Sequence, residues 1–140
     1  MLIKLTVFLP LLAFLASSLL GRFAVGKNKI FADKFAQFFT SSLLVISAIC
    51  AIIIFAQYYQ SPEVVNITLF NWISSGTLVV NWSLYLDSLT ATMLVVVTVV
   101  SALVHIYSIG YMAKDMSINR FMSYLSLFTF FMLILVTADN

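Results

Sequence analysis

One histidine stands inside a long apolar segment, and its side chain is the one in this sequence best suited to chemistry. His105 lies in the stretch Ser-Ala-Leu-Val-His-Ile-Tyr-Ser-Ile-Gly-Tyr, which begins at Ser101. An ionisable side chain within an apolar segment of membrane-spanning length is costly to bury, so it is a functional candidate by default. Because an unperturbed imidazole titrates near neutrality, it can both accept and release a proton. The residue type therefore predicts proton handling.

Four further polar residues fall on or near the helical face that carries His105. Asp87 is aligned with His105, because the eighteen residues that separate them make about five helical turns. Thr98 and Ser101 lie close to the same line, and Ser108 lies somewhat off it. The spacing predicts a stripe of small and hydroxylated residues along one face of this helix, ending in an acid near one membrane surface.

Two interpretations of this stripe remain open. Small and hydroxylated residues let membrane helices approach closely, so spacing alone favours a packing face. Alternatively, Ser, Thr and His line a hydrated path along which His105 passes protons. The proton-path candidates are His105, Ser101, Thr98 and Asp87. For Asp87 the position just before Leu89 favours a helix N-cap over a buried relay acid.

Composition settles the class of protein. The chain has 140 residues, of which 63% are hydrophobic and 9% charged, whereas soluble domains are about 25% charged. An integral membrane protein is expected, and the net charge of +2 gives no reason to expect a nucleic-acid partner. The single cysteine, Cys50, cannot form an intramolecular disulfide. Since no phosphate-binding loop, metal-ligand cluster or paired nucleophile and base is evident, we expect no catalytic residue, metal or cofactor site in this chain.

Apolar segments predict an all-α integral membrane fold with four spans. A helix needs about 20 mostly apolar residues to cross the hydrocarbon core. The stretches that qualify are Leu2–Leu20, Phe35–Tyr59, Tyr85–Met112 and Phe121–Ala138. The first also resembles a signal peptide, but its length and the basic cluster after it favour a retained span. Pro10 near its middle predicts a kink.

Basic residues predict the orientation of the spans. They follow the first span and the third one, whereas the segment between the second and third spans has no Lys or Arg; the basic positions are Arg22, Lys27, Lys29, Lys34, Lys114 and Arg120. The positive-inside rule places both basic loops in the cytoplasm or in the matrix of an organelle. Both chain termini are then expected on the outer side, although Lys4 opposes this weakly.

The segment between the second and third spans predicts a β-hairpin on the outer side. Two runs rich in β-branched and aromatic residues, Val65–Trp72 and Thr77–Tyr85, flank the turn signal Ser-Ser-Gly at 74–76. Trp72, Trp82 and Tyr85 suit the membrane–water interface, while an irregular interfacial loop is the alternative. The expected organisation is two spans with a basic loop in 1–60, the hairpin in 61–84 and two spans in 85–140.

Three stretches together resemble a known family. They are Trp82–Met93, Val104–Met112 and Asn119–Met132. With them the whole chain resembles NADH–quinone oxidoreductase subunit L, called NADH dehydrogenase subunit 5 in mitochondria, a subunit of the membrane arm of respiratory complex I. The resemblance is loose over the first 60 residues and tight from about Asn81 onward.

The resemblance implies a proton-translocating, antiporter-like helical bundle with no cofactor of its own. NADH, FMN, iron–sulfur clusters and quinone are then expected in partner subunits. The implied partners are the other membrane-arm subunits and the lipid bilayer. The implied location is the bacterial inner membrane or the mitochondrial inner membrane. His105 matches a histidine of the family, which favours a place for it in the proton path or its support.

The sequence also departs from the family. Members are several times longer than 140 residues, and after the position matching Asn140 they continue into a helix with a Gly-Trp-Glu-Gly motif. That glutamate and later lysines handle protons in the family. The chain therefore resembles the N-terminal part of the subunit, and by itself we expect no proton translocation. The alternatives are the large subunit of a multisubunit cation/proton antiporter, or a separate four-helix membrane protein with a structural or assembly role.

Overall fold

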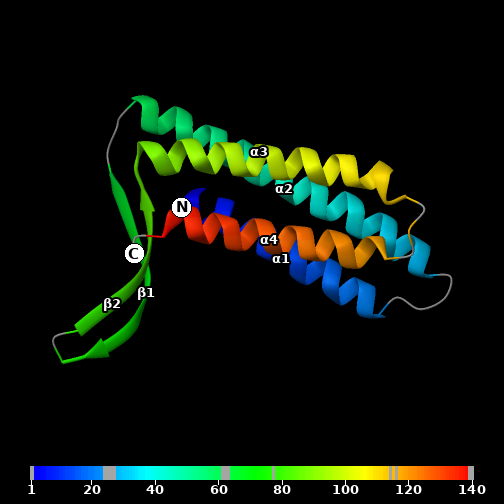
Figure 1. Ribbon diagram of the computed structural model, residues 1–140, viewed down its shortest axis with the longest axis horizontal. Coiled ribbons are helices and arrows are strands. Elements are labelled where there is room, and N and C mark those ends of the chain that lie inside the picture. The colour runs from blue at the N-terminus through cyan, green and yellow to red at the C-terminus, as the bar shows by residue number, and fades with distance from the viewer. Residues whose placement is uncertain are drawn as a thin grey trace.

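The chain forms four long helices and one β-hairpin (Figure 1). The computed structural model describes residues 2–23, 28–60, 64–76, 78–113, 115 and 117–138, without the side chains of 20–23, 28–30, 32 and 78. In chain order the elements are α1 (Leu2–Phe23), α2 (Asn28–Gln60), β1 (Val65–Ser75), β2 (Leu78–Leu86), α3 (Ser88–Tyr111) and α4 (Ile118–Thr137). All four helices contain a stretch long and apolar enough to cross a membrane. The predicted fold class, four spans with a hairpin between the second and third, is confirmed.

Consecutive helices run in opposite directions and pack into one bundle. The α1–α2 and α3–α4 connections lie at one end, here named the loop end, and the hairpin lies at the other, the hairpin end (Figure 1). Helix α1 packs against α2 and α4, while α3 packs against α2 and α4. Both predicted basic loops therefore belong to the same end of the bundle, as the topology prediction required. The arrangement is independent of which compartment that end faces.

The helix boundaries differ from the predicted spans by up to seven residues. Helix α1 ends three residues later and α4 begins three residues earlier than predicted. Helix α3 begins at Ser88 rather than Tyr85, because Tyr85 and Leu86 pair with β1 and Asp87 caps the helix. Helix α2 begins at Asn28, a full turn or more before the predicted span, because a helix can extend beyond the apolar core into the polar layer. Pro10 lies inside α1, which continues on both sides of it.

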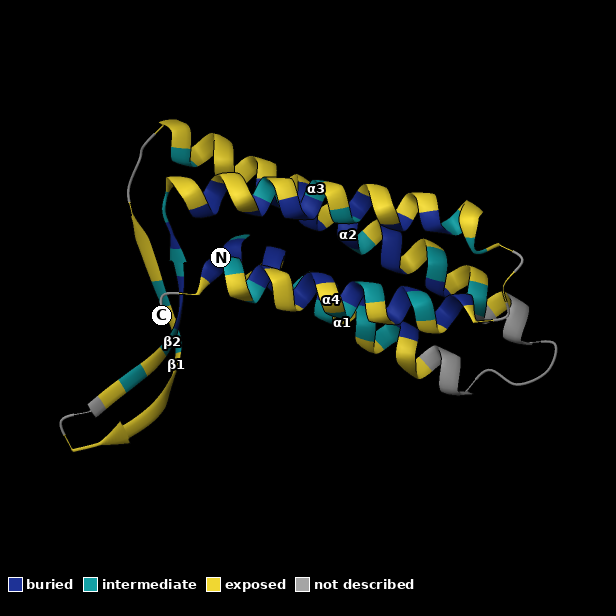
Figure 2. Cartoon of the chain, in the orientation of Figure 1, coloured by how far each residue is buried: buried dark blue, intermediate teal, exposed yellow. Residues whose placement is uncertain are grey.

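Apolar side chains from all parts of the chain meet inside the bundle. At the hairpin end, Val7 of α1, Leu94 of α3 and Leu133 of α4 are fully buried and pack with Leu84 of the hairpin. Figure 2 shows buried positions along the inner faces of the helices and exposed ones on their outer faces. The exposed outer faces are themselves apolar, which suits a bundle whose surroundings are lipid or protein rather than water.

The hairpin is antiparallel and lies across the end of the bundle (Figure 1). Its turn contains Gly76 with φ +60°, a left-handed conformation that glycine adopts at no steric cost. The base is held by the bundle, since Leu84 and Leu86 are buried, whereas β1 is exposed from Phe70 onward. The hairpin prediction is confirmed, and the irregular-loop alternative is wrong.

Aromatic rings gather on one face of the hairpin. The rings of Phe70 and Trp82 lie 5.1 Å apart edge to face, and those of Trp72 and Trp82 lie 6.0 Å apart in the same way. Trp72 remains 63% exposed. Indole rings with one apolar and one polar end favour the membrane–water interface, so this cluster suits that layer.

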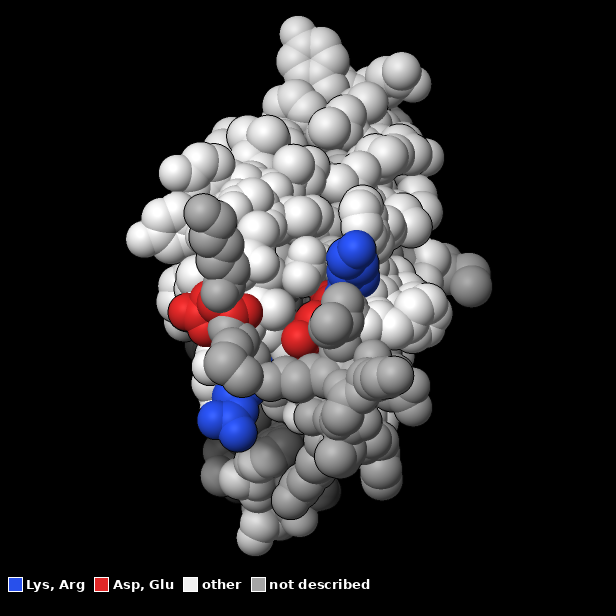
Figure 3. Space-filling model, turned by 90° about the vertical axis from the view of Figure 1, so that its right-hand side faces the viewer, with Lys and Arg blue, Asp and Glu red and all other residues white. Residues whose placement is uncertain are grey.

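Charged residues gather at the loop end. Figure 3, viewed from that end, shows a few basic and acidic side chains among described residues that are mostly uncharged. Of the basic side chains predicted there, those of Lys34 and Arg120 are described, and both are exposed. Lys27 and Lys114 lie outside the described residues, as do the side chains of Arg22 and Lys29.

Candidate functional site

The side chain of His105 is fully buried and joins α3 to α4. Its Nδ1 lies 2.8 Å from the carbonyl oxygen of Ser101, one turn earlier on α3. Its Nε2 lies 3.1 Å from Oγ of Ser126 on α4. Both ring nitrogens therefore have partners, and one of these partners belongs to another helix. This contact is one of two polar links between α3 and α4, the two helices that carry the sequence signature.

The hydrogen-bond partners determine how the imidazole can be protonated. A carbonyl oxygen can only accept, so Nδ1 carries a proton in either charge state. Ser126 Oγ also lies 2.9 Å from the carbonyl oxygen of Met122, and its single proton cannot serve both contacts. With a neutral imidazole, Ser126 donates to Nε2. With a charged imidazolium, Nε2 donates to Ser126, which donates to Met122. A rotation of one hydroxyl therefore accommodates both states.

Ser101 takes part in a second link to α4. Its Oγ accepts a hydrogen bond of 3.1 Å from Thr129, and its carbonyl oxygen is the partner of His105. Thr129 Oγ1 also lies 3.0 Å from its own helix carbonyl at Leu125, so its proton has two possible acceptors. The structure thus brings together two of the predicted residues, Ser101 and His105, with two residues of α4.

The other two predicted residues lie apart from this link. Thr98 is fully buried on the same face, but its hydroxyl donates to the Leu94 carbonyl of its own helix at 2.7 Å. Asp87 caps α3 and accepts a hydrogen bond of 2.7 Å from the backbone N–H of Thr90. That bond lowers the pKa of the Asp87 carboxyl below its ordinary value. The prediction that Asp87 is an N-cap is therefore confirmed. Asp87 lies about 27 Å along the helix from His105.

A polar stripe on α4 was missed by the sequence analysis. Its buried members are Asn119, Ser123, Ser126, Thr129 and Thr137; the first four follow at steps of three or four residues, and the last lies about two turns further on. This spacing places them on one helical face, and it is the pattern from which the stripe could have been predicted. It was hidden by the phenylalanines and leucines between them, which make α4 read as uniformly apolar.

Helix α1 makes its own polar contacts with α4, toward the loop end. Ser17 Oγ donates to Oδ1 of Asn119 at 2.5 Å, and Ser123 Oγ lies 2.9 Å from Ser17 Oγ. Nearer the hairpin end, Ser47 of α2 donates to the carbonyl of Thr6 on α1 at 2.8 Å. Most other buried hydroxyls donate to a carbonyl one turn back in their own helix, which satisfies them without a partner helix. Among the described residues, most cross-helix contacts between polar side chains therefore involve α4, which contacts α3 through Ser126 and Thr129 and α1 through Asn119 and Ser123.

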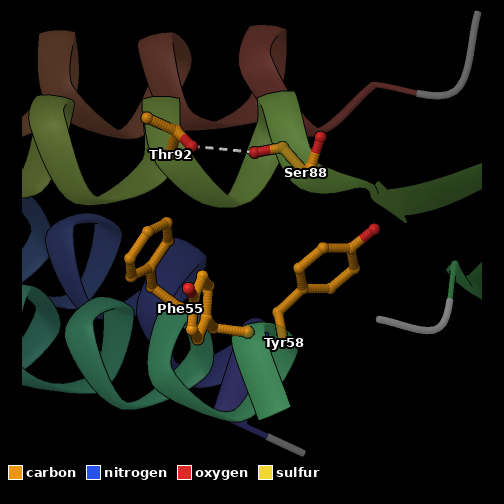
Figure 4. A pocket seen from close by; sticks show the side chains of 5 residues that line it. Phe55, Tyr58, Ser88 and Thr92 are labelled. Carbon is orange, nitrogen blue, oxygen red and sulfur yellow. Dashed lines mark hydrogen bonds between the residues drawn. The ribbon is translucent and has the colours of Figure 1, made fainter. Parts of the chain in front are cut away.

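A cavity of about 410 Å³ lies elsewhere, between the hairpin ends of α2 and α3. It is lined by Phe55, Tyr58, Tyr59, Ser88 and Thr92, and Figure 4 shows the α2 rings facing the α3 hydroxyls. Thr92 donates to the Ser88 carbonyl at 2.8 Å. The lining is mostly apolar and contains no His, Cys, Asp, Glu or Lys, so the buried histidine is the better functional candidate.

The similarity of the chain to known proteins shows the family to which it is related. Residues 72–122 match the family model described as NADH-Ubiquinone oxidoreductase (complex I), chain 5 N-terminus. These residues comprise the second half of the hairpin, α3 and the first turn of α4, and so include Ser101 and His105.

Relatives come from bacteria and from eukaryotes. NADH-quinone oxidoreductase subunit L of Rickettsia felis is 49% identical over 112 residues, covering 80% of this chain and 17% of the relative. NADH-ubiquinone oxidoreductase chain 5 of Trichophyton rubrum is 48% identical over 134 residues, covering 96% and 19%. The same chain of Phytophthora infestans is 46% identical over 140 residues, covering 100% and 20%.

The chain spans about a fifth of the length of these relatives. Identity near one half over nearly the whole chain, together with the matched N-terminal family model, agrees with the resemblance of the sequence signature. The chain belongs to the complex I family of NADH-quinone oxidoreductase subunit L and NADH-ubiquinone oxidoreductase chain 5.

Proposed function

We propose that the chain acts as the N-terminal part of a membrane-arm subunit of proton-translocating NADH:quinone oxidoreductase. In that role it contributes to coupling electron transfer to proton pumping. The observation that carries the proposal is the buried His105 held between Ser101 and Ser126, in a chain of this family. The complex I names of the relatives favour this function over the antiporter and over the separate four-helix protein.

His105 suits a proton-handling role because its surroundings can stabilise both of its charge states. When Nε2 receives a proton, it becomes a donor to Ser126, whose hydroxyl turns toward the Met122 carbonyl. When Nε2 loses the proton, the same hydroxyl turns back. Neither state leaves a ring nitrogen unpaired, and an unpaired buried polar atom is the usual obstacle to titration inside an apolar bundle.

Translocation in this proposal needs more than these four helices. Among the described residues of the four spans, His105 is the ionisable group that is fully buried. Because the chain spans about a fifth of its relatives' length, we propose that the remaining length supplies the core of the proton channel, so that the isolated chain is inactive. NADH, FMN, iron–sulfur clusters and quinone are assigned to partner subunits.

The membrane location follows from the same proposal. The chain is proposed to lie in the bacterial or mitochondrial inner membrane, beside other membrane-arm subunits; its four apolar helices and the names of its relatives support this. The basic loop end faces the cytoplasm or matrix, and the hairpin and both termini face the opposite side. A protease or thiol-reagent accessibility assay on sealed vesicles of known orientation tests this topology at the hairpin.

Replacing His105 in the full-length subunit, within the assembled complex, tests the proton role. We expect His105→Ala to lower proton pumping per NADH oxidised while the complex still assembles. His105→Gln keeps hydrogen-bonding groups without a titratable nitrogen, so it should also lower pumping. Ser108→Ala is the matched control, since that buried hydroxyl donates to its own helix at the Val104 carbonyl. Unchanged pumping in both histidine variants of an assembled complex would refute the proton role and leave His105 a packing residue.

A further inference from the structure

One buried hydroxyl in the bundle has no hydrogen-bond partner among the described residues. Ser41 of α2 is 6% exposed, and its Oγ makes no contact within hydrogen-bonding distance in that part of the chain. Its neighbours behave differently: Thr40 donates to the Ala36 carbonyl and Ser42 to the Phe38 carbonyl, each at 2.7 Å. The hydroxyl of Ser41 makes no such bond, and a buried hydroxyl without a partner is costly.

The fold places Ser41 on the side of α2 that carries a buried cluster shared with α3, nearer the loop end. Ser41 lies on the same side of α2 as Ala48, because seven residues make about two turns. Ala48 belongs to the same buried cluster as Ala102 of α3. Since α2 and α3 run in opposite directions, moving from Ala48 to Ser41 and from Ala102 to His105 both lead toward the loop end. With Ala48 and Ala102 taken as level, Ser41 lies four residues, or about 6 Å along the helix axis, beyond His105.

We propose that Ser41 binds a buried water molecule on the side of α2 that carries the cluster shared with α3, toward the loop end. Buried waters make about three hydrogen bonds to polar groups that would otherwise lack partners. Ser41 Oγ supplies one of these contacts. Carbonyl oxygens of the facing helical turns, each with a second lone pair, accept the water's protons.

The water extends the proton-handling site toward α2. Ser126 contacts the imidazole from α4, and Ser41 lies on the side of α2 that carries the cluster shared with α3. Both ring nitrogens of His105 already have partners, so the water acts on the imidazole as a nearby dipole and not as a direct proton acceptor. This functional role rests on the proposed function, whereas the binding of the water depends on Ser41 alone.

A density map of the intact complex with the full-length subunit, at a resolution that shows ordered waters, tests the site directly. We expect a water at about 2.8 Å from Ser41 Oγ. Ser41→Ala should remove that water, and the matched control Ser42→Ala should leave it in place, because Ser42 is exposed and bonded to its own helix. A Ser41 hydroxyl bonded to a carbonyl of α2, with no water beside it, would overturn the inference.

Pumping measured on the same variants separates the two proposals. A water that Ser41→Ala removes, with pumping unchanged in both Ser41→Ala and His105→Ala, establishes the binding site and refutes the proton role. Lower pumping in His105→Ala without any water at Ser41 refutes the water site and leaves the proton role standing. Loss of the water together with lower pumping in Ser41→Ala supports both.

Discussion

The Nε2 atom of His105 and the hydroxyl of Ser126 lie 3.1 Å apart across the α3–α4 interface, although 21 residues separate them in sequence. The same hydroxyl lies 2.9 Å from the Met122 carbonyl. Because one hydroxyl proton has two acceptors, its orientation reports the charge of the imidazole. Ser126 is therefore a positioning residue, which influences the protonation of His105 through this hydrogen bond.

Removing the Ser126 hydroxyl should change the protonation of His105 without unfolding the bundle. In Ser126→Ala the charged imidazolium loses the acceptor for its Nε2 proton, so the neutral form is favoured. We expect pumping to fall and its pH dependence to shift toward lower pH, measured on the assembled complex. Ser126→Thr, which restores a hydroxyl, should recover the wild-type profile. A profile for Ser126→Ala identical to wild type would show that the contact does not control His105.

The cap on α3 should depend on pH. The pKa of Asp87 is lowered in the folded state, mainly by the hydrogen bond from the Thr90 backbone N–H. Its stabilising contribution is therefore complete above the ordinary carboxyl pKa of about 3.9 and is lost as the pH falls through the lowered folded value. Thermal unfolding in detergent should show Asp87→Ala less stable than wild type at pH 7, with the difference shrinking at about pH 3. A difference that does not change with pH would mean that the charge contributes nothing.

Two glycines should respond to alanine substitution in opposite directions. Gly76 has φ +60°, so Gly76→Ala should weaken the hairpin by about 1 kcal/mol. Hydrogen exchange of hairpin amides should then quicken about fivefold. Gly110 lies within α3, and a Cβ there meets nothing within 4 Å, so Gly110→Ala should stabilise the helix by about 0.5 kcal/mol or more. The same direction of change in both variants would contradict this account.

Loss of the Asn119 side-chain amide should destabilise the contact between α1 and α4. Asn119→Ala removes the side-chain acceptor of the buried Ser17 hydroxyl, which keeps only the longer contact of 3.2 Å to the backbone carbonyl of residue 119. We expect destabilisation of about 1–2 kcal/mol, seen as a lower unfolding temperature of the solubilised protein. Arg120→Ala, at the exposed neighbouring position, serves as the control and should change stability by less than about 0.5 kcal/mol. Equal effects of the two substitutions would show that the amide contact is not stabilising.

Much of the architecture could be predicted from local patterns. Apolar length located four spans, and the turn at Gly76 between β-branched runs located the hairpin. The position of Asp87 before α3 predicted a cap, because capping depends on residues within one turn. The start of α3 was predicted three residues too early, because hydropathy does not distinguish the apolar end of a strand from the start of a helix.

The candidate site shows where such prediction ends. His105 and Ser101 could be found on one helix, because their spacing is a property of that helix alone. Their partners Ser126 and Thr129 could not, because hydroxyls recur on several faces of several spans and sequence does not state which faces meet. The partnerless hydroxyl of Ser41 is likewise invisible in the sequence, where it resembles its neighbour Ser42.

The sequence by itself determined the membrane class, the number of spans, the hairpin and the family, since these depend on composition, segment length, local pattern and the residue order of the matching stretches. Only the tertiary structure decided that His105 meets Ser126, that Ser101 meets Thr129, and that the hydroxyl of Thr98 is satisfied within its own helix. The physical reason is that a buried side chain's protonation depends on groups brought to it from other helices, and the rotation and level of each helix are fixed by packing between them.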